Sequence, residues 1–468
     1  MLDDRLIAEL KRYQQSHLIA FWNTLNPTER KTLESQLRSI DFAQVERLRK
    51  GHDESPDWAA LSARAEPPPS IRLPESASDM AYFEQREEAI ALGNQALRSS
   101  KLAMILVAGG QGTRLGFNLP KGMFRIGPLS NRTLFEMHVD RLRAMMKEYH
   151  VSIPLYIMTS PATDARTRTF FSENDCFGLG SDQLRIFCQG TMPAIDAETG
   201  QILLGAPGEV SLSPDGHGGM LQAMSVHGCL DDAADQGIEH FFYGQVDNPL
   251  VEICDPFLIG HHIRANSDMT SQVVPKKTPI DRVGNVVTVD GRLQVIEYSD
   301  LPESAGKQVN RDGSLKLWAG NIAVHVFRHR FLDRVQHSVE GLPFHRARKA
   351  VPHVDEHGKL VEPKQPNAIK FERFIFDLLP LAERGLVVEG DAACVFAPVK
   401  NADGAPNETP ASTKQAISTL HRSWLRAAGA ALDENNIVEI HPNWALNAEA
   451  VAKKISPGLP IAADTYFI

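Results

Sequence analysis

Residues 102–116 read LAMILVAGGQGTRLG, a short apolar run that leads directly into a stretch with four glycines. A continuous apolar run of this length is typical of a strand that helices cover on both faces, as in a parallel sheet. Adjacent glycines let backbone N–H groups turn toward a phosphate, because no Cβ atom stands in the way. The stretch therefore predicts an α/β fold whose core begins with this strand and whose glycine loop can bind an anion.

The next elements along the chain continue this pattern. Thr133 and Glu136 have the spacing of a capping box, and apolar residues follow at helical intervals. Residues 153–158 are the next apolar run, so one strand–helix–strand unit is visible. A third apolar run at 241–246 ends at Asp247 and Asn248. Open α/β sheets bind ligands beyond the carboxyl ends of their strands, so these two residues are candidates for a site.

Length and pattern predict three consecutive domains. The chain has 468 residues, which at about 150 residues per domain corresponds to about three units. Residues 1–100 are helical in pattern, with an N-cap signal at Asn26 and a helix expected over 79–98. In 101–400 short apolar runs alternate with helical patterns, and Asp290-Gly291 predicts a hairpin. We therefore expect a helical N-terminal domain (1–100), an α/β domain (101–400) and a small C-terminal domain (401–468).

The composition excludes several classes of protein. Hydrophobic residues make up 43% and charged residues 23%, which is ordinary for a globular protein. A net charge of −9 argues against a broad surface for nucleic acid or acidic membranes. The apolar run at 102–108 is far shorter than the roughly 18–20 residues that a membrane helix needs, and no secretory signal pattern opens the chain. The five cysteines include no Cys-x-x-Cys pair, so we expect a cytoplasmic protein without a disulfide framework or zinc site.

The glycine loop fits neither of two common nucleotide motifs. Counted from Gly110, the third glycine of a dinucleotide-binding fingerprint would fall on Leu115, and no Gly-Lys-Ser/Thr triplet follows for a P-loop. The glycines alone are about as consistent with a structural turn. Arg114 and Lys121 shift the balance, because cations on and just after such a loop suit a triphosphate.

These residues, with Pro120 before Lys121, resemble the signature of the UTP-dependent sugar-1-phosphate uridylyltransferases, in particular the UDP-N-acetylhexosamine pyrophosphorylases. Further segments between about residues 101 and 400 resemble that family in the expected order; they begin at Gln189, Pro214, Val246, Gly284, Glu297, Gly320, Ile369, Phe374 and Lys400. The resemblance implies a Rossmann-like nucleotidyltransferase core with a mixed, mostly parallel sheet, a helical N-terminal part and a small C-terminal domain. Residues 101–400 would then be the catalytic nucleotidyltransferase domain.

The resemblance also implies roles for individual residues. The catalytic cations would be Arg114, Lys121 and Lys400, with Lys276 a further phosphate candidate, and Asp247 would help to place Mg²⁺. The nucleotide would be bound by Gly109, Gly110, Gly112, Thr113, Gln189, Gly216 and His217. The sugar would be bound by Gly284, Glu297, Asn321, Phe374 and Phe376.

The implied reaction is Mg²⁺-assisted in-line attack of a sugar 1-phosphate on the α-phosphate of UTP, which yields a UDP-sugar and pyrophosphate. An anionic phosphate needs no general base, in keeping with the lack of a nucleophile motif. We expect N-acetylglucosamine 1-phosphate as the substrate and a monomer or weak homo-oligomer. His217 leaves alternatives open, because this position is usually Asn in the N-acetylhexosamine enzymes and His in the UDP-glucose enzymes. The alternatives are a UDP-glucose or broad-specificity pyrophosphorylase and, from another class, a non-catalytic UDP-sugar-binding regulator.

Several of these residues also have a structural interpretation. Asp247 could cap a turn, and His217 could be an ordinary loop histidine. Phe374 and Phe376 alternate in an apolar stretch, where core packing is more common than ligand contact. Glu297 and Asn321 could belong to solvated loops. The basic segment 345–349 is interpreted as a solvated face, and the pair at 261–262 receives no role.

Overall fold

The computed structural model describes residues 2–51, 57–74, 76, 78–338 and 341–468, and it divides the chain into two compact units. The smaller unit consists of Met1–Asp57, Gln189–Gln222 and Glu340–Asp377, and the larger unit of the remaining residues. The division differs from three consecutive domains, because two segments of the predicted core belong with the first helices and the rest of the N-terminal segment belongs with the core. The boundaries at 100 and 400 therefore stay a prediction.

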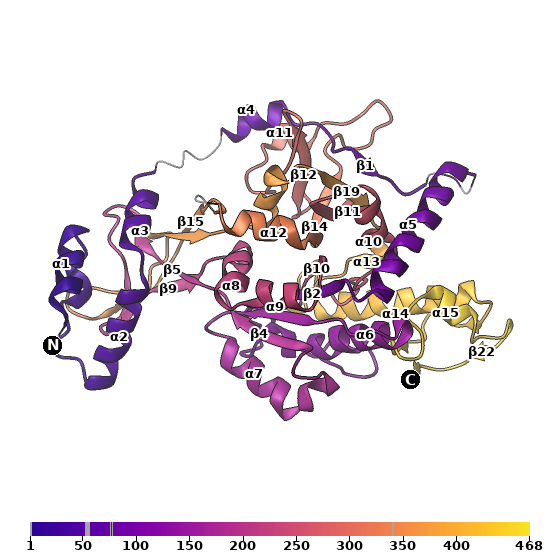
Figure 1. The fold of residues 1–468 in the computed structure, drawn as a ribbon, viewed down its shortest axis with the longest axis horizontal. Coiled ribbons are helices and arrows are strands. Elements are labelled where there is room, and N and C mark those ends of the chain that lie inside the picture. Colours follow the sequence, from indigo (N-terminus) through magenta and orange to yellow (C-terminus); the bar gives the residue numbers. More distant parts are fainter. Residues whose placement is uncertain (1, 52–56, 75, 77, 339–340) are drawn as a thin grey trace. The chain divides into compact units, whose positions relative to one another are not determined.

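The larger unit is built on one central sheet (Figure 1). In spatial order its strands are β1 (Ser70–Ile71), β19 (Gly385–Glu389), β11 (Met269–Pro275), β14 (Ala319–Arg328), β10 (His240–Gln245), β2 (Leu102–Val107), β3 (Leu155–Thr159) and β4 (Leu184–Cys188). Neighbouring strands are parallel except at β14, which is antiparallel to both β10 and β11. The predicted mixed, mostly parallel sheet is thus confirmed, and β10 pairs directly with the strand that precedes the glycine loop.

A hairpin branches from the middle of this sheet. β12 (Gly284–Val289) pairs with β13 (Arg292–Ile296), and its first residues also pair with β14. Asp290 and Gly291 between the two strands have φ of 51° and 80°. Two consecutive positive φ angles suit the tight turn that an Asp-Gly pair favours, so the predicted hairpin is confirmed.

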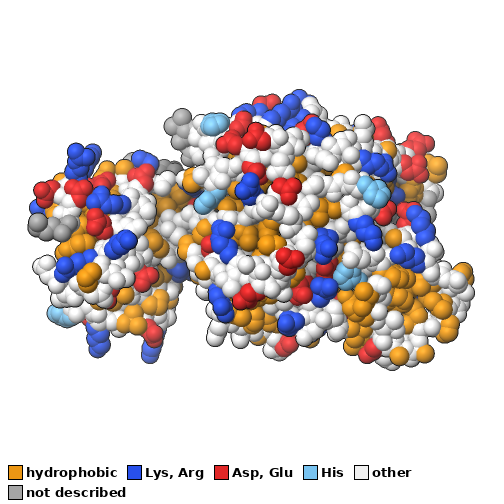
Figure 2. Space-filling view, turned by 60° about the horizontal axis from the view of Figure 1, so that its bottom comes forward, with side chains coloured by type: hydrophobic (Ala, Val, Ile, Leu, Met, Phe, Trp, Pro, Cys, Tyr) orange, Lys and Arg blue, Asp and Glu red, His pale blue; other side chains and the backbone are white. Residues whose placement is uncertain are grey.

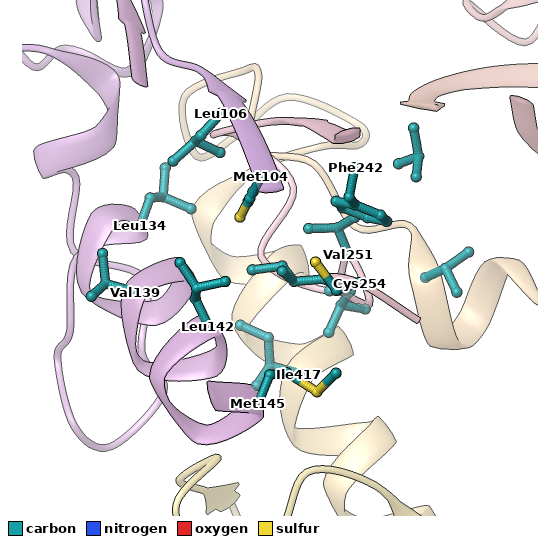
Figure 3. Close-up of a cluster of buried hydrophobic side chains, with 14 of the residues drawn as sticks. Met104, Leu106, Leu134, Val139, Leu142, Met145, Phe242, Val251, Cys254 and Ile417 are labelled. Atoms are coloured by element: carbon teal, nitrogen blue, oxygen red, sulfur yellow. The ribbon is translucent and has the colours of Figure 1, made fainter. Parts of the chain in front are cut away.

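Helices cover the sheet, and apolar side chains pack between the helices and the strands. Figure 3 shows Leu142 and Met145 of α6 (Leu134–Tyr149) near Ile417 of α14 (Pro410–Ala427), with Met104 of β2 in the same cluster. All four side chains are buried in one cluster. The capping box of Thr133 and Glu136 starts α6, as predicted. The segment after residue 400 contributes α14 to this core and adds the short strand pairs β20–β22 (Ala431–Leu432, Pro460–Ile461) and β21–β23 (Val438–Ile440, Thr465–Phe467).

Two glycines join part of the N-terminal segment to the larger unit. α5 (Met80–Arg98) packs on α10 (Pro256–Arg264), where a Cβ on Gly93 would lie 2.0 Å from the Pro256 carbonyl oxygen. A Cβ on Gly260 would lie 1.6 Å from the carbonyl oxygen of Ala89. Only glycine permits this approach at either position. The close contact explains why residues 80–98 belong to the larger unit.

The smaller unit joins three helices to short strands. The helices are α1 (Asp4–Arg12), α2 (Pro27–Ser39) and α3 (Phe42–Arg49), and the strands include β6 (Ile195–Asp196), β15 (His345–Lys349) and β18 (Ala368–Glu372). Leu33 and Leu37 of α2 are buried in a cluster with Ile195 and Phe371. The capping box of Asn26 and Glu29 starts α2, as its sequence predicts.

Positive and negative side chains are interspersed on the face drawn in Figure 2. This mixture agrees with the modest net charge of −9. Among the described residues, no helix combines the length and the apolar character that a membrane crossing requires.

Candidate functional site

The glycine loop leaves β2 and closes on itself. The N–H of Gly112 donates to the Leu119 carbonyl at 3.0 Å, and the N–H of Lys121 donates to the Gly110 carbonyl at 2.9 Å. A Cβ on Gly112 would lie 2.7 Å from the carbonyl oxygen of Phe117, so this position requires glycine. The loop is therefore a fixed turn with Lys121 at its end.

Part of the loop presents unused donors to solvent. Gly110, Gln111 and Thr113 are exposed, and their backbone N–H groups donate no hydrogen bond within the part of the chain that the structure describes. Apart from its two chain neighbours, no described residue has an atom within 4 Å of where a Cβ on Gly110 would stand. Gly109 contributes differently, because its carbonyl accepts a 2.7 Å hydrogen bond from Ser160 Oγ, which fixes the start of the loop. The loop can thus offer backbone donors to phosphate oxygens.

Lys121 and Asp247 lie together where β10 ends. Lys121 Nζ is 3.2 Å from Asp247 Oδ2, and the two side chains are only 17% and 12% exposed. Arg114 follows the loop on the short helical turn Thr113–Leu115, is exposed, and forms no ion pair with any residue that the structure describes. One cation is therefore held beside a carboxylate, and the other extends into solvent.

Asn248 connects this strand end to Lys400. Its Nδ2 donates to the Val395 carbonyl at 2.7 Å, and its Oδ1 accepts from the N–H of Ala397 at 3.1 Å. The N–H of Val399 donates to the Asp247 carbonyl at 2.9 Å. The backbone that carries Lys400 is therefore attached to the Asp-Asn pair. In this way the structure brings Lys121, Asp247 and Lys400 to one end of the sheet.

Three of the predicted sugar-binding residues also lie together in the larger unit. Gly284 of β12 is paired with Asn321 of β14. A Cβ on Gly284 would lie 2.6 Å from Glu297 Oε1, so glycine leaves the space that this carboxylate occupies. The side chain of Asn321 accepts a 3.0 Å hydrogen bond from the N–H of Ala323, which has a positive φ of 55°.

Lys276 is buried and follows directly after β11. Its Nζ donates to Asn285 Oδ1 at 2.5 Å, and burial lowers the pKa of Lys276 below its ordinary value, against the opposing charge of Asp281. Asn285 in turn donates from Nδ2 to the Ile296 carbonyl at 3.2 Å. A cation held by a neutral amide keeps the capacity to bind an anion.

Gln189 in the smaller unit has its amide fixed by two acceptors. Its Nε2 donates to Asp215 Oδ1 and to the Gly216 carbonyl, both at 3.2 Å, while Oε1 accepts no hydrogen bond from the described residues. Burial raises the pKa of Asp215, although its hydrogen bond with Gln189 opposes this. Gly216 has a φ of 86°, and a Cβ there would lie 2.4 Å from the Arg373 carbonyl oxygen. The buried amide therefore presents one acceptor in a fixed direction.

His217 lies among aromatic rings of the same unit. Its ring centroid is 5.4 Å from that of Phe374, in a stacked arrangement, and 5.7 Å from that of Phe376. Desolvation, and next the charge of His345, lower the pKa of His217 to about 4. The N–H of Ile375 donates to His217 Nδ1 at 3.2 Å. The neutral ring must therefore carry its proton on Nε2, which makes Nε2 a hydrogen-bond donor.

The sequence interpretation missed a histidine–aspartate pair in this ring cluster. His345 Nε2 lies 2.8 Å from Asp377 Oδ2, and the His345 ring lies 4.5 Å from that of Phe374. His345 is the first residue of the segment 345–349, which was interpreted as a solvated basic face. Its side chain instead contacts Asp377 and Phe374. Asp377 follows Phe376 directly in the sequence. The aromatic-rich segment 374–376 was therefore the sequence feature that could have pointed to this pair. The buried carboxylate of Asp215, beside Gln189, lies in the segment from Pro214 that resembles the family, but the sequence assigned it no role of its own.

The acidic residues present are sparse for a metal site built from protein ligands alone. No group of three or more His, Cys, Asp or Glu side chains suitable for a metal occurs among the described residues. Mg²⁺ in nucleotide enzymes commonly takes one or two carboxylates, with phosphate and water oxygens supplying the rest. Asp247 alone, next to the glycine loop, fits that kind of ligand set.

Comparison with known proteins identifies the family. The model of the family described as UTP–glucose-1-phosphate uridylyltransferase matches residues 64–416. Human UDP-N-acetylhexosamine pyrophosphorylase-like protein 1 is 37% identical over 93% of this chain and 87% of its own length. UDP-N-acetylglucosamine pyrophosphorylase of Saccharomyces cerevisiae is 39% identical over 75% of each chain.

A solved structure shares the fold over nearly the whole length. It is the uridine diphosphate N-acetylglucosamine pyrophosphorylase from Trypanosoma brucei in complex with an inhibitor, with a TM-score of 0.83, 25% identity and 98% of each chain covered. The shared fold, the match of the family model and the relatives that align over most of their length all indicate the same family. The chain therefore belongs to the UTP–glucose-1-phosphate uridylyltransferase family, whose members are UTP-dependent sugar-1-phosphate uridylyltransferases.

Proposed function

We propose that this chain forms UDP-N-acetylglucosamine and pyrophosphate from UTP and N-acetylglucosamine 1-phosphate. The observation that carries the proposal is the Lys121–Asp247 ion pair beside a glycine loop with unused N–H donors, with the backbone that leads into Lys400 hydrogen-bonded to Asp247. Relatives named for UDP-N-acetylglucosamine support the choice of sugar.

The reaction needs positioning and charge neutralisation. A phosphate oxygen of the sugar phosphate attacks the α-phosphorus of UTP, the bond to the β-phosphate oxygen breaks, and pyrophosphate leaves. Arg114 and Lys121 neutralise the β- and γ-phosphates, the loop N–H groups bind their oxygens, and Lys400 binds the α-phosphate or sugar phosphate. Fixed donors and cations stabilise the charge that develops as pyrophosphate departs.

The proposal includes Mg²⁺, on which nucleotidyltransferases typically depend. Asp247 would hold it together with phosphate oxygens and water, and the ion would neutralise phosphate charge. Lys121 now pairs with Asp247 at 3.2 Å. The lysine would then have to exchange that carboxylate for phosphate oxygens when nucleotide and metal bind.

Gln189 is proposed to recognise the uracil base. Both of its amide hydrogens are used, on Asp215 and Gly216, so only Oε1 remains to face a ligand. Uracil carries an N–H at N3, whereas cytosine has an acceptor there. A fixed acceptor therefore favours uracil over cytosine, because the wrong base would leave two acceptors facing each other.

A second candidate function, a UDP-glucose or broad-specificity pyrophosphorylase, is favoured by His217. Its Nε2–H can donate to a ligand oxygen, as an Asn amide could, so a histidine here does not by itself demand glucose.

Gly284, Glu297 and Asn321 are proposed to bind the hydroxyl groups of the sugar. Phe374 and Phe376 are proposed to contact the group at the sugar's second carbon.

Pyrophosphate release by the purified protein tests the proposal. UTP and Mg²⁺ are supplied with N-acetylglucosamine 1-phosphate or glucose 1-phosphate in separate reactions. We expect faster release with the first. Preference for the second would replace the proposed sugar by the second candidate. Release with neither, together with measurable UDP-sugar binding, would indicate a non-catalytic binding protein.

A further inference from the structure

Glu408 holds Lys400 through both its backbone and its side chain. The Glu408 carbonyl accepts from the N–H of Lys400 at 2.8 Å and from the N–H of Asn401 at 3.0 Å. Its Oε1 lies 3.2 Å from Lys400 Nζ. The ammonium of Lys400 also lies 5.7 Å from the ring centroid of Phe396. One residue thus fixes the main chain of this lysine and the direction of its side chain.

The backbone of Glu408 is strained. Its φ is 55°, in the left-handed region, although it is not a glycine. An L residue with a Cβ adopts this conformation at an energetic cost, and such residues concentrate at functional sites. The residues on both sides of Glu408 are held in place. Asn401 Nδ2 donates to the Asn407 carbonyl at 3.0 Å, and Thr409 is the N-cap of α14.

A glycine would meet the backbone requirement at position 408 at lower cost. It would keep both carbonyl hydrogen bonds and relieve the strain. What glycine cannot supply is the carboxylate, whose hydrogen-bonded partner is Lys400. The choice of glutamate is therefore explained by the ion pair.

The ion pair is open to exchange. The side chains of Lys400 and Glu408 are 35% and 23% exposed, so a phosphate can reach the ammonium from solvent. A lysine carries a flexible four-carbon stem, and holding it in one direction in advance removes entropy that ligand binding would otherwise have to offset.

We propose that Glu408 is a positioning residue, which holds the Lys400 ammonium ready to exchange its carboxylate for a ligand phosphate. This inference rests on the proposed function, since it takes Lys400 to be a phosphate-binding residue. Glu408 itself touches no reacting atom.

Three substitutions separate positioning from a purely structural role. Glu408→Gln, Glu408→Ala and Glu408→Gly each remove the carboxylate, and we expect each to lower kcat by about tenfold or more, with a smaller change in the KM for UTP. Their thermal stability should diverge, because Glu408→Gly relieves the strained φ and should melt at or above the wild-type temperature, whereas Glu408→Ala keeps the strain. The matched control is Glu449→Gln, which breaks an exposed Glu–Lys pair with Lys453 and should leave turnover unchanged.

A glycine variant that is stable but slow would support positioning, since a structural role predicts that activity follows stability. Turnover within twofold of wild type in Glu408→Gln and Glu408→Gly would overturn the proposal. So would activity losses that follow the melting temperatures across the series.

Chemical labelling gives a readout that does not depend on catalysis. Trinitrobenzenesulfonate modifies free amines, and peptide mass spectrometry measures the rate at Lys400 relative to exposed lysines. We expect severalfold faster labelling at Lys400 in Glu408→Gln, because the amine is released from its ion pair. An unchanged rate would overturn the contact. If wild type released no pyrophosphate with any sugar phosphate while labelling still responded, the proposed function would fail and the positioning contact would stand.

Discussion

The lysines proposed to bind phosphate at positions 121 and 400, in the larger unit, and the candidates Gln189 and His217, in the smaller unit, are held by opposite means. In the larger unit Lys121 and Lys400 are charged, partly exposed, and held by single carboxylates at 3.2 Å. In the smaller unit Gln189 is a buried neutral amide, and His217 is a neutral ring fixed by Ile375 and two phenylalanines. Movable ion pairs suit phosphates, whose charge must be neutralised as it develops. Fixed neutral donors and acceptors suit the recognition of a base or a sugar, because the direction of each hydrogen bond determines which ligand fits.

The largest effect should come from the movable side of this comparison. Lys121→Ala removes a cation from the proposed phosphate site, and we expect turnover to fall by roughly 10²–10³-fold or more with the fold intact. Steady-state pyrophosphate release and a melting curve measure the two properties. Lys147→Ala, at the far end of α6, is a control that should leave turnover unchanged. Near-normal turnover in Lys121→Ala would show that Lys121 does not bind the phosphates in the reaction.

The fixed side should respond in binding. Gln189→Ala deletes the acceptor proposed for uracil N3–H and leaves Asp215 without its partner, so UTP affinity should fall by roughly 10–100-fold. Calorimetric titration with UTP and CTP measures both the loss and the discrimination between the bases. If the variant binds UTP as tightly as wild type does, uracil is not recognised by Gln189.

The neutrality of His217 predicts a dependence of stability on pH. Its native pKa of about 4 lies below the unfolded value of about 6.5, so only the unfolded chain takes up this proton as the pH falls between them. The stability contributed by the neutral ring is complete above about pH 6.5 and is lost as the pH falls toward 4. By linkage the loss is about 2 kcal/mol at pH 5.

Replacement by asparagine tests this pH dependence, because asparagine does not titrate. Denaturant unfolding at pH 7 and pH 5 should show a smaller loss for His217→Asn than for wild type, with the difference near that value. Equal losses in the two proteins would mean that the native ring takes up its proton over this pH range as readily as the unfolded chain does, so that its pKa is not lowered by folding.

The smallest effect should come from the His345–Asp377 pair, whose histidine ring contacts Phe374. Asp377→Asn keeps an acceptor for His345 and should change the KM for the sugar phosphate less than twofold. Asp377→Ala removes the acceptor that lies 2.8 Å from His345 Nε2, and should raise that KM a few-fold with kcat nearly unchanged. Equal behaviour of the two variants would show that the hydrogen bond does not matter.

Local sequence signals predicted the elements that carry the site, because local chemistry forms them. The strand before the glycine loop, the capping boxes at Asn26 and Thr133, and the Asp290-Gly291 hairpin all depend on residues within a few positions of one another. The placement of Asp247 at a strand end followed from hydrophobicity alone. These predictions needed no knowledge of distant contacts.

What the sequence did not predict depends on contacts between distant segments. His345 and Asp377 are 32 residues apart, and residues 189–222 and 340–377 join the first helices only through tertiary packing. Glu408 lies eight residues after Lys400 in a loop closed by a left-handed backbone, which no periodic pattern reveals. The role of Asn248 as a clamp on residues 395–397 likewise needed the fold.

The reaction proposed for this chain is the transfer of the uridylyl group of UTP to N-acetylglucosamine 1-phosphate. The most direct test supplies limiting UTP, Mg²⁺ and equal concentrations of N-acetylglucosamine 1-phosphate and glucose 1-phosphate, and then identifies the products by mass. We expect UDP-N-acetylglucosamine to predominate and pyrophosphate to appear in an amount equal to the UDP-sugar formed. Predominance of UDP-glucose would contradict the proposed substrate, and the absence of any UDP-sugar would contradict the proposed reaction.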